Sequence, residues 1–175
     1  MDHFVIPECF VDTNLIETIS PPRDHYNHQK GCGTVTKVMR EKYGNDFAVG
    51  IIDKDKVEVD YLKEFDIVHQ DGSLVLHKHP NKNHYIIQIC PAMERFIMKC
   101  ATDSGISLKD FDLPEDLNGL RKVSKKVTSK DDVKFKLLFK KLVKINNVEV
   151  IRLREWINYL KNNMYNVDLK TLINI

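Results

Sequence analysis

The chain has 175 residues, of which 42% are hydrophobic and 30% are charged. These proportions fit one globular domain and exclude intrinsic disorder, which needs low hydrophobicity and high net charge. Four cysteines are too few for a disulfide-stapled scaffold. No apolar run approaches the roughly 20 residues of a membrane-spanning helix, and the N-terminus does not resemble a signal peptide. We therefore expect a soluble, cytoplasmic protein with reduced thiols and no membrane partner.

The net charge is only +2, but the charges are unevenly distributed. Ten basic and two acidic residues lie between Arg121 and Lys144, a local charge of +8, so the rest of the chain carries −6. Clustered Lys and Arg release counterions when they meet nucleic acid. This stretch therefore predicts nucleic-acid binding, for which we single out Lys136, Lys140 and Lys141. The alternative is a solvated helix face.

The first half of the chain alternates between strand and helix patterns. The expected elements are a strand at 4–6, a helix at 12–19, a weak strand at 24–29, a helix at 34–43 and a strand at 47–52. The last of these is a continuous apolar run, which is typical of a strand buried on both faces. Strands separated by helices in this order indicate a parallel α/β sheet with right-handed crossovers.

The second half begins with a hairpin pattern and then becomes helical. Strands are expected at 66–69, 74–78 and 84–89, the first two flanking a Gln-Asp-Gly-Ser turn. Pro91 is expected to open a helix that closes near Gly105. From Leu117 onward the pattern is all-helical, most strongly over 149–163. We therefore expect an α/β domain at 1–105, with a helical extension at 106–175 packed on it as a single globular unit.

Acidic residues follow the expected strands. Glu8 follows the first strand and Asp12 lies four residues later; Asp53 and Asp55 follow the buried strand; Glu94 lies in the first turn of a helix. Sites in open α/β sheets lie outside the carboxyl ends of the strands. Clustered carboxylates repel one another unless a cation neutralises them, and hard oxygen ligands favour Mg²⁺ or Mn²⁺. The alternatives are strand termination and ordinary helix N-terminal positions.

A glycine-containing loop, Lys30-Gly31-Cys32-Gly33-Thr34, leads into a predicted helix. Glycines let backbone amides approach an anion, and a helix N-terminus favours phosphate. We therefore single out Lys30, Gly31 and Gly33 as phosphate-binding residues. The spacing is not that of a Walker loop, and a simple tight turn is the alternative.

Three segments in combination resemble the Toprim domain: Glu8-Cys9-Phe10-Val11-Asp12, the glycine loop and Ile51-Ile52-Asp53-Lys54-Asp55. That domain is shared by topoisomerases, primases and the overcoming-lysogenisation-defect nucleases. Its pattern is a Glu after the first strand, often an Asp four residues later, a Gly-bearing loop, and Asp-x-Asp after the third strand. The resemblance covers about residues 3–100 and is strongest to a compact bacterial group. It implies a Toprim-like, Rossmannoid sheet, here with a hairpin insertion and a C-terminal helical extension.

The resemblance also implies an activity, that of a Mg²⁺-dependent nuclease or related phosphoryl-transfer enzyme acting on nucleic acid. Glu8, Asp53 and Asp55 would be catalytic and hold the metal, and Asp12 matches a less uniform position; with Glu94 from the strand-end argument, these five form the candidate metal set. Compact Toprim proteins often work beside ATPases in bacterial defence against phage, so the resemblance implies an ATPase partner and an effector role. It leaves homo-oligomer formation open.

Two other functions fit parts of the sequence. Phe10-Val11-Asp12-Thr13-Asn14 resembles the opening of PIN-domain ribonucleases, in which a strand ends in Asp-Thr-Asn and Asp12 would be the first metal ligand. That interpretation leaves Asp53 without a role. The remaining alternative is a non-catalytic module that binds nucleic acid or protein, with the acids as ordinary loop residues.

Overall fold

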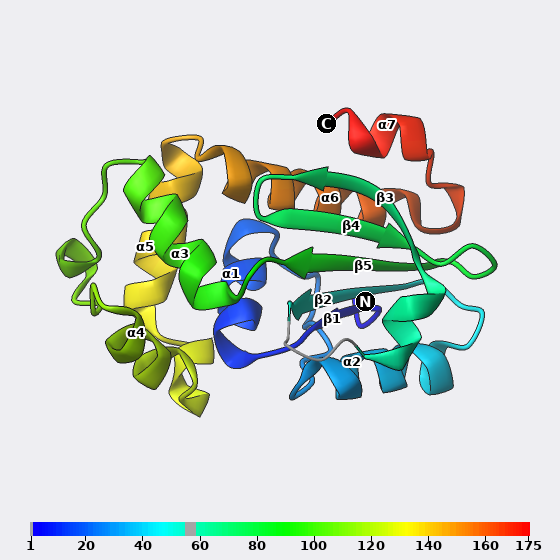
Figure 1. Ribbon diagram of the computed structural model, residues 1–175, viewed down its shortest axis with the longest axis horizontal. Helices are drawn as coiled ribbons and strands as arrows, with labels where there is room; N and C mark the ends of the chain where they lie inside the picture. The colour runs from blue at the N-terminus through cyan, green and yellow to red at the C-terminus, as the bar shows by residue number, and fades with distance from the viewer. Residues whose placement is uncertain (1, 55–58) are drawn as a thin grey trace.

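A computed structural model, which describes residues 2–54 and 59–175, shows an α/β protein with a five-stranded mixed sheet (Figure 1). The strands are β1 (Val5–Pro7), β2 (Ala48–Asp53), β3 (Asp66–Asp71), β4 (Leu74–Lys78) and β5 (His84–Ile89). Their order across the sheet is β1-β2-β5-β4-β3. β1, β2 and β5 are parallel, whereas β4 is antiparallel to both β5 and β3. The predicted hairpin is confirmed, and it extends the sheet rather than standing beside it.

The central strand β2 explains why the apolar run at 47–52 is continuous. It pairs with β1 on one side and β5 on the other, and it is covered on both faces. Val49 and Ile51 join one apolar cluster, while Ala48 and Ile52 join the other. Since successive side chains of a strand point to opposite faces, a strand between two layers needs apolar residues at every position. The prediction of a doubly buried parallel strand is confirmed.

The larger apolar cluster lies between the sheet and most of the helices. These helices are α1 (Phe10–Ile19), α3 (Met93–Asp103), α4 (Leu117–Ser124), α5 (Val133–Lys144), α6 (Val148–Asn163) and α7 (Leu169–Ile173). The predicted α/β domain (1–105) and the predicted helical extension (106–175) both contribute residues to this cluster, including Trp156 of α6. The short α7 lies beside β3 at the end of the sheet (Figure 1), where Leu172 is fully buried.

The other face of the sheet is covered by a smaller layer. α2 (Cys32–Val38) continues directly into a π-helix (Met39–Tyr43), and a 3₁₀ helix (Asp60–Glu64) completes the layer. α2 and the π-helix together confirm the helix predicted over 34–43, and the π-helix forms its widened last turn. The chain leaves the helix at Gly44, as expected of a helix C-terminus.

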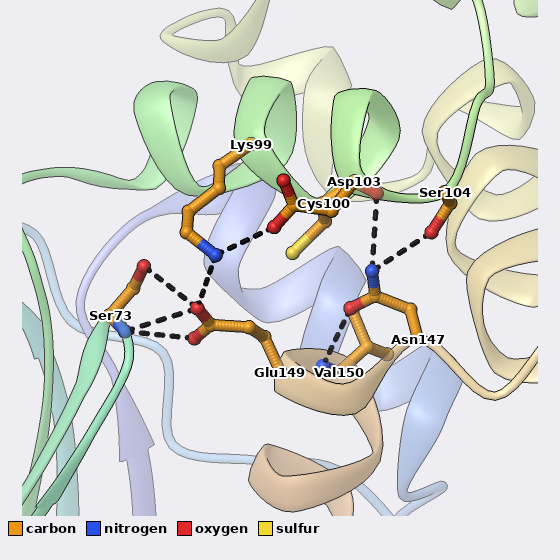
Figure 2. A network of polar contacts seen from close by, with 8 residues as sticks. All are labelled: Ser73, Lys99, Cys100, Asp103, Ser104, Asn147, Glu149 and Val150. Atoms are coloured by element: carbon orange, nitrogen blue, oxygen red, sulfur yellow. Dashed lines mark hydrogen bonds and ion pairs between the residues drawn. The ribbon is translucent and has the colours of Figure 1, made fainter.

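A buried carboxylate fastens the β3–β4 turn to the helical layer, as Figure 2 shows. Both oxygens of Glu149, in the first turn of α6, accept the backbone N–H of Ser73, and Oε1 also accepts the Ser73 hydroxyl. Lys99 of α3 donates to the same carboxylate at 2.7 Å and to Asp103 at 2.7 Å. Gly72 has φ +55°, and a Cβ there would collide with Glu149. The turn therefore requires glycine for both conformation and space.

Three local predictions differ from the structure. Residues 24–29 form no strand; the segment runs along the open edge of β1 with two backbone hydrogen bonds, Asn27 N–H to Val5 and Gln29 N–H to Pro7, both 3.0 Å. α1 begins at Phe10 rather than 12, because Cys9 caps it. α3 begins at Met93 rather than at Pro91. Within the described ranges, no helix has the length and apolar composition needed to cross a membrane.

Candidate active site

Three of the predicted acids line one pocket of about 900 Å³. Glu8 follows β1, Asp53 ends β2, and Glu94 lies in the first turn of α3 after β5. These are the carboxyl ends of the three adjacent parallel strands, which is where α/β sheets place their sites. The pocket is completed by Cys9, Phe10, His28, Lys30, Gly31, Ala92, Arg121, Ser124 and Lys125.

Asp53 is the most perturbed of these acids. Its backbone N–H donates to Glu8 Oε2 at 2.8 Å, so the two residues are in direct contact. Its Oδ1 is buried and, within the described part of the chain, has no hydrogen-bond partner. Burial, together with the charges of Asp12, Glu8 and Glu94, raises the pKa of Asp53 to about 9, against the lowering effect of the Met93 N–H. A buried oxygen of this kind favours a proton or a cation beside it.

Asp12 lies behind the pocket rather than in its wall. It is fully buried, and its carboxylate accepts the Cys9 thiol at 2.7 Å and the Cys9 backbone N–H at 3.2 Å. This is a capping box at the start of α1. Burial raises the pKa of Asp12 to about 7. The geometry therefore gives Asp12 the role of a helix N-terminal residue, although its charge still acts on Asp53.

Of the two remaining predicted acids, Glu94 lines the pocket, whereas Asp55 is not among the described residues. Glu94 is 7% exposed and accepts the Ser124 hydroxyl of α4 at 2.6 Å, so it faces the pocket from the helical side. Asp55 lies outside the described residues, so its predicted role stays a prediction.

The pocket does not preform a complete cage of protein oxygens. Among the described residues, no three of its acidic side chains bring ligand atoms within 4.8 Å of one another. Mg²⁺ tolerates such a site, because it usually keeps several waters and is bound through one or two carboxylates plus substrate phosphates. The contact of Glu8 with Asp53 and the unpartnered Oδ1 fit that mode of binding.

The glycine loop is split between two surfaces. Lys30 and Gly31 line the acidic pocket, whereas Gly33 lies inside α2 and lines a separate hollow with Thr36 and Arg40. Gly31 has φ +91°, a conformation that favours glycine, and its N–H donates to the Glu8 carbonyl at 3.3 Å. That N–H therefore positions Glu8, and Lys30 is the loop's contribution of positive charge to the pocket.

His28 lines the pocket but was not among the predicted site residues, although it lies two residues before Lys30 of the glycine loop. Its ring stacks on Phe10 at 4.5 Å, and Nδ1 lies 2.9 Å from the Thr13 hydroxyl. That hydroxyl donates its own proton to the Cys9 carbonyl at 2.7 Å, so it accepts from His28 Nδ1–H. The neutral ring then carries its lone pair on Nε2. Burial lowers the pKa of His28, which favours this neutral form.

The basic residues of the pocket are not the ones singled out from the sequence. The pocket is lined by Arg121, in the last turn of α4, and by Lys125, directly after that helix. Of the lysines predicted to bind nucleic acid, Lys140 is exposed on α5 and Lys136 is half-buried. Lys141 lines a different hollow of about 540 Å³ beside the Glu149 network. Arg121 and Lys125 belong to the same basic stretch, but only the position of α4 distinguishes them.

Comparisons with protein-family models, with curated proteins and with solved structures found no match for this chain. The function of the pocket is therefore inferred from its own chemistry.

The buried acids predict how the stability of the metal-free protein depends on pH. Asp53 and Asp12 have folded-state pKa values of about 9 and about 7, both above the ordinary value near 3.8. At pH values between the ordinary and the folded-state pKa, each of these two groups binds more protons in the folded state than in the unfolded state. Their contribution to stability is therefore fully present below the ordinary pKa and is lost as pH rises through the folded-state pKa values. We expect a loss on the order of a few kcal/mol between about pH 5 and pH 9.

Urea unfolding in EDTA at pH 5, 7 and 9 measures this dependence. The matched variant is Asp53→Asn, in which the main titrating group is absent and the pH dependence should flatten. An equal decline in wild type and variant would show that Asp53 does not hold a proton in the folded state.

Proposed function

We propose that the protein is a divalent-metal-dependent nuclease of Toprim type, acting in the pocket of Glu8, Asp53 and Glu94. The observation that carries this proposal is the buried, unpartnered Oδ1 of Asp53, in an acid-lined pocket at the ends of three parallel strands. A structural carboxylate would be satisfied by donors from the fold. This one is instead raised in pKa by burial and by neighbouring acids, as functional carboxylates often are.

The metal, Mg²⁺ or Mn²⁺, would be held by Asp53 and Glu8 and would supply Lewis-acid stabilisation of charge on the phosphate oxygens. Glu8 is positioned for this by two backbone contacts: its carboxylate accepts the Asp53 N–H, and its carbonyl accepts the Gly31 N–H. Glu94 is held by the hydroxyl of Ser124 in α4.

His28 is the group best prepared to accept a proton in this pocket. Its Nδ1–H is directed to Thr13, which leaves the Nε2 lone pair for a water molecule or a leaving group. Its neutral form is favoured because burial lowers its pKa. In the proposed reaction, His28 takes the proton of the attacking water, while the acids hold the metal.

Basic residues of the pocket would contact the substrate phosphates. Lys30, Arg121 and Lys125 line the same pocket as the acids. A guanidinium binds phosphate through two parallel hydrogen bonds, whereas an ammonium acts as a point charge. Acids and cations in the same pocket match a phosphodiester whose charge is shared between a metal and the protein.

The PIN-type alternative is less consistent with this structure. It needs a strand ending at Phe10-Val11 and Asp12 as a ligand, but all three residues lie in helix α1. Both Asp12 oxygens are used by Cys9.

The direct test is cleavage of single- and double-stranded DNA and RNA with Mg²⁺, with Mn²⁺ and with EDTA, combined with thermal unfolding. The proposal predicts metal-dependent cleavage and stabilisation by millimolar metal. Unchanged unfolding together with the absence of cleavage on every substrate would favour a non-catalytic binding module.

A second test separates pocket cations from surface cations. We expect Arg121→Ala to lower cleavage about 10²-fold or more, because a phosphate contact inside the pocket acts on the reacting group. The triple change of Lys136, Lys140 and Lys141 to Glu should weaken nucleic-acid binding and reduce its salt dependence. Cleavage rates measure the first effect, and electrophoretic mobility shifts at several salt concentrations measure the binding and its salt dependence. An unchanged salt slope in the triple variant would assign those lysines to ordinary surface.

A further inference from the structure

A second group of metal-binding side chains lies at the opposite end of β1 from the acidic pocket. His3 precedes β1, while Asp24 and His25 lie in the segment after α1. One ligand atom from each lies within 4.8 Å of the others, and among the described residues this is the only such group of three. His3 Nε2 is 3.7 Å from Asp24 Oδ2, and His25 Nδ1 is 3.1 Å from the same oxygen.

These separations are close to what a tetrahedral ion requires. Zinc binds imidazole nitrogen and carboxylate oxygen at about 2.0–2.2 Å, which places neighbouring ligand atoms about 3.3–3.5 Å apart. The two imidazole rings meet edge-to-face with centroids 4.2 Å apart, so both reach the same space beside Asp24. Small side-chain movements would equalise the distances, because His25 and Asp24 are exposed.

The backbone beneath these residues is fixed from both sides. Asp2 accepts the Arg23 N–H at 3.1 Å and pairs with Lys161 at 3.1 Å. The Asn27 N–H donates to the Val5 carbonyl at 3.0 Å, and the Tyr43 hydroxyl donates to the His3 carbonyl. The two segments, about 20 residues apart in sequence, are thus held together without a metal. Preorganisation of this kind lowers the cost of binding.

We propose that His3, Asp24 and His25 form a binding site for a borderline divalent transition ion of the Zn²⁺ class, with water as the fourth ligand. Such ions bind imidazole nitrogen well, whereas Mg²⁺ prefers oxygen ligands. The bound ion would fasten the segment along the open edge of β1 to the start of that strand. It would act independently of the acidic pocket, which lies beyond the other end of β1.

The test is titration of the EDTA-treated, desalted full chain with ZnCl₂, followed by calorimetry and thermal unfolding. We expect one ion per chain at this site and a rise in melting temperature of roughly 5 °C at a hundredfold excess over the dissociation constant. Co²⁺ as a stand-in should show the intense visible absorption of four-coordinate geometry.

Variants assign the ligands. His3→Asn and His25→Asn should each weaken Zn²⁺ binding at least tenfold while leaving unfolding in EDTA unchanged, because both side chains are at least partly exposed. The matched control is His69→Gln, which removes an imidazole from β3, and Asp53→Asn tests the acidic pocket. The proposal is overturned if His3→Asn and His25→Asn bind Zn²⁺ as wild type does, or if Asp53→Asn removes the binding.

Discussion

Asp53→Asn is expected to reduce metal-dependent cleavage about 10³-fold while leaving the metal-free protein as stable as wild type or more stable. The substitution keeps the shape of the side chain but removes its ability to become a carboxylate when a metal binds. If Asp53 holds the metal, the variant loses several kcal/mol of transition-state stabilisation. In EDTA the same change replaces a group that burial and the charges of Asp12, Glu8 and Glu94 already keep protonated below about pH 9, so no folding energy should be lost.

The measurement is urea unfolding of both proteins in EDTA and in Mg²⁺, together with cleavage rates. Wild type should gain stability from Mg²⁺, and the variant should gain much less. Asp110→Asn is the matched control, because Asp110 is an exposed acid on a 3₁₀ helix distant in sequence from every strand end. An equal destabilisation of Asp53→Asn in both buffers, by about 1–3 kcal/mol, would show that Asp53 is a structural hydrogen-bonding residue.

Glu149→Ala is expected to cost about 3 kcal/mol of unfolding free energy without affecting the acidic pocket directly. Glu149 is buried and accepts both the N–H and the hydroxyl of Ser73 (Figure 2), which the alanine variant would leave unpaired. Each buried, unsatisfied group costs about 1–3 kcal/mol. The urea midpoint should fall by roughly 1–2 M, with an unchanged denaturant slope.

Asp103→Ala is the matched control for this prediction. Asp103 pairs with the same lysine, Lys99, at the same distance of 2.7 Å, but it is about half exposed. An exposed pair contributes about 0–1 kcal/mol, so the control should unfold within that range of wild type. Equal losses in the two variants would mean that Lys99, rather than the Ser73 turn, determines the contribution of Glu149.

Much of the fold could be predicted because local patterns and the final structure agree. The hairpin at 66–78, the strand at 84–89 and the helix over 149–163 all appear, the last with a one-residue difference at its start. Each has a strong period and clear end signals. The segment 24–29 could not be predicted in this way, because it lies at an edge and its polar residues make only occasional hydrogen bonds to β1.

The candidate site was predictable in part for the same reason. Glu8 and Asp53 follow parallel strands, and the ends of adjacent parallel strands must meet at one edge of the sheet. Asp12 shows the limit of that reasoning: its position in the sequence suits a ligand, but Cys9 engages both of its oxygens. Spacing along the chain does not reveal which neighbour satisfies a carboxylate.

The α/β class, the buried central strand and the convergence of acids at the strand ends could be read from the sequence, because they follow from periodicity and strand direction. Which cations face the acids, and which histidine joins them, depends on the packing of elements that are distant in sequence. Arg121 and His28 are distant from Asp53 in sequence and reach it through the packing of α4 and the loop before α2. Tertiary packing likewise brings His3 beside His25. Such contacts depend on how whole elements pack, and no local pattern along the chain encodes that packing.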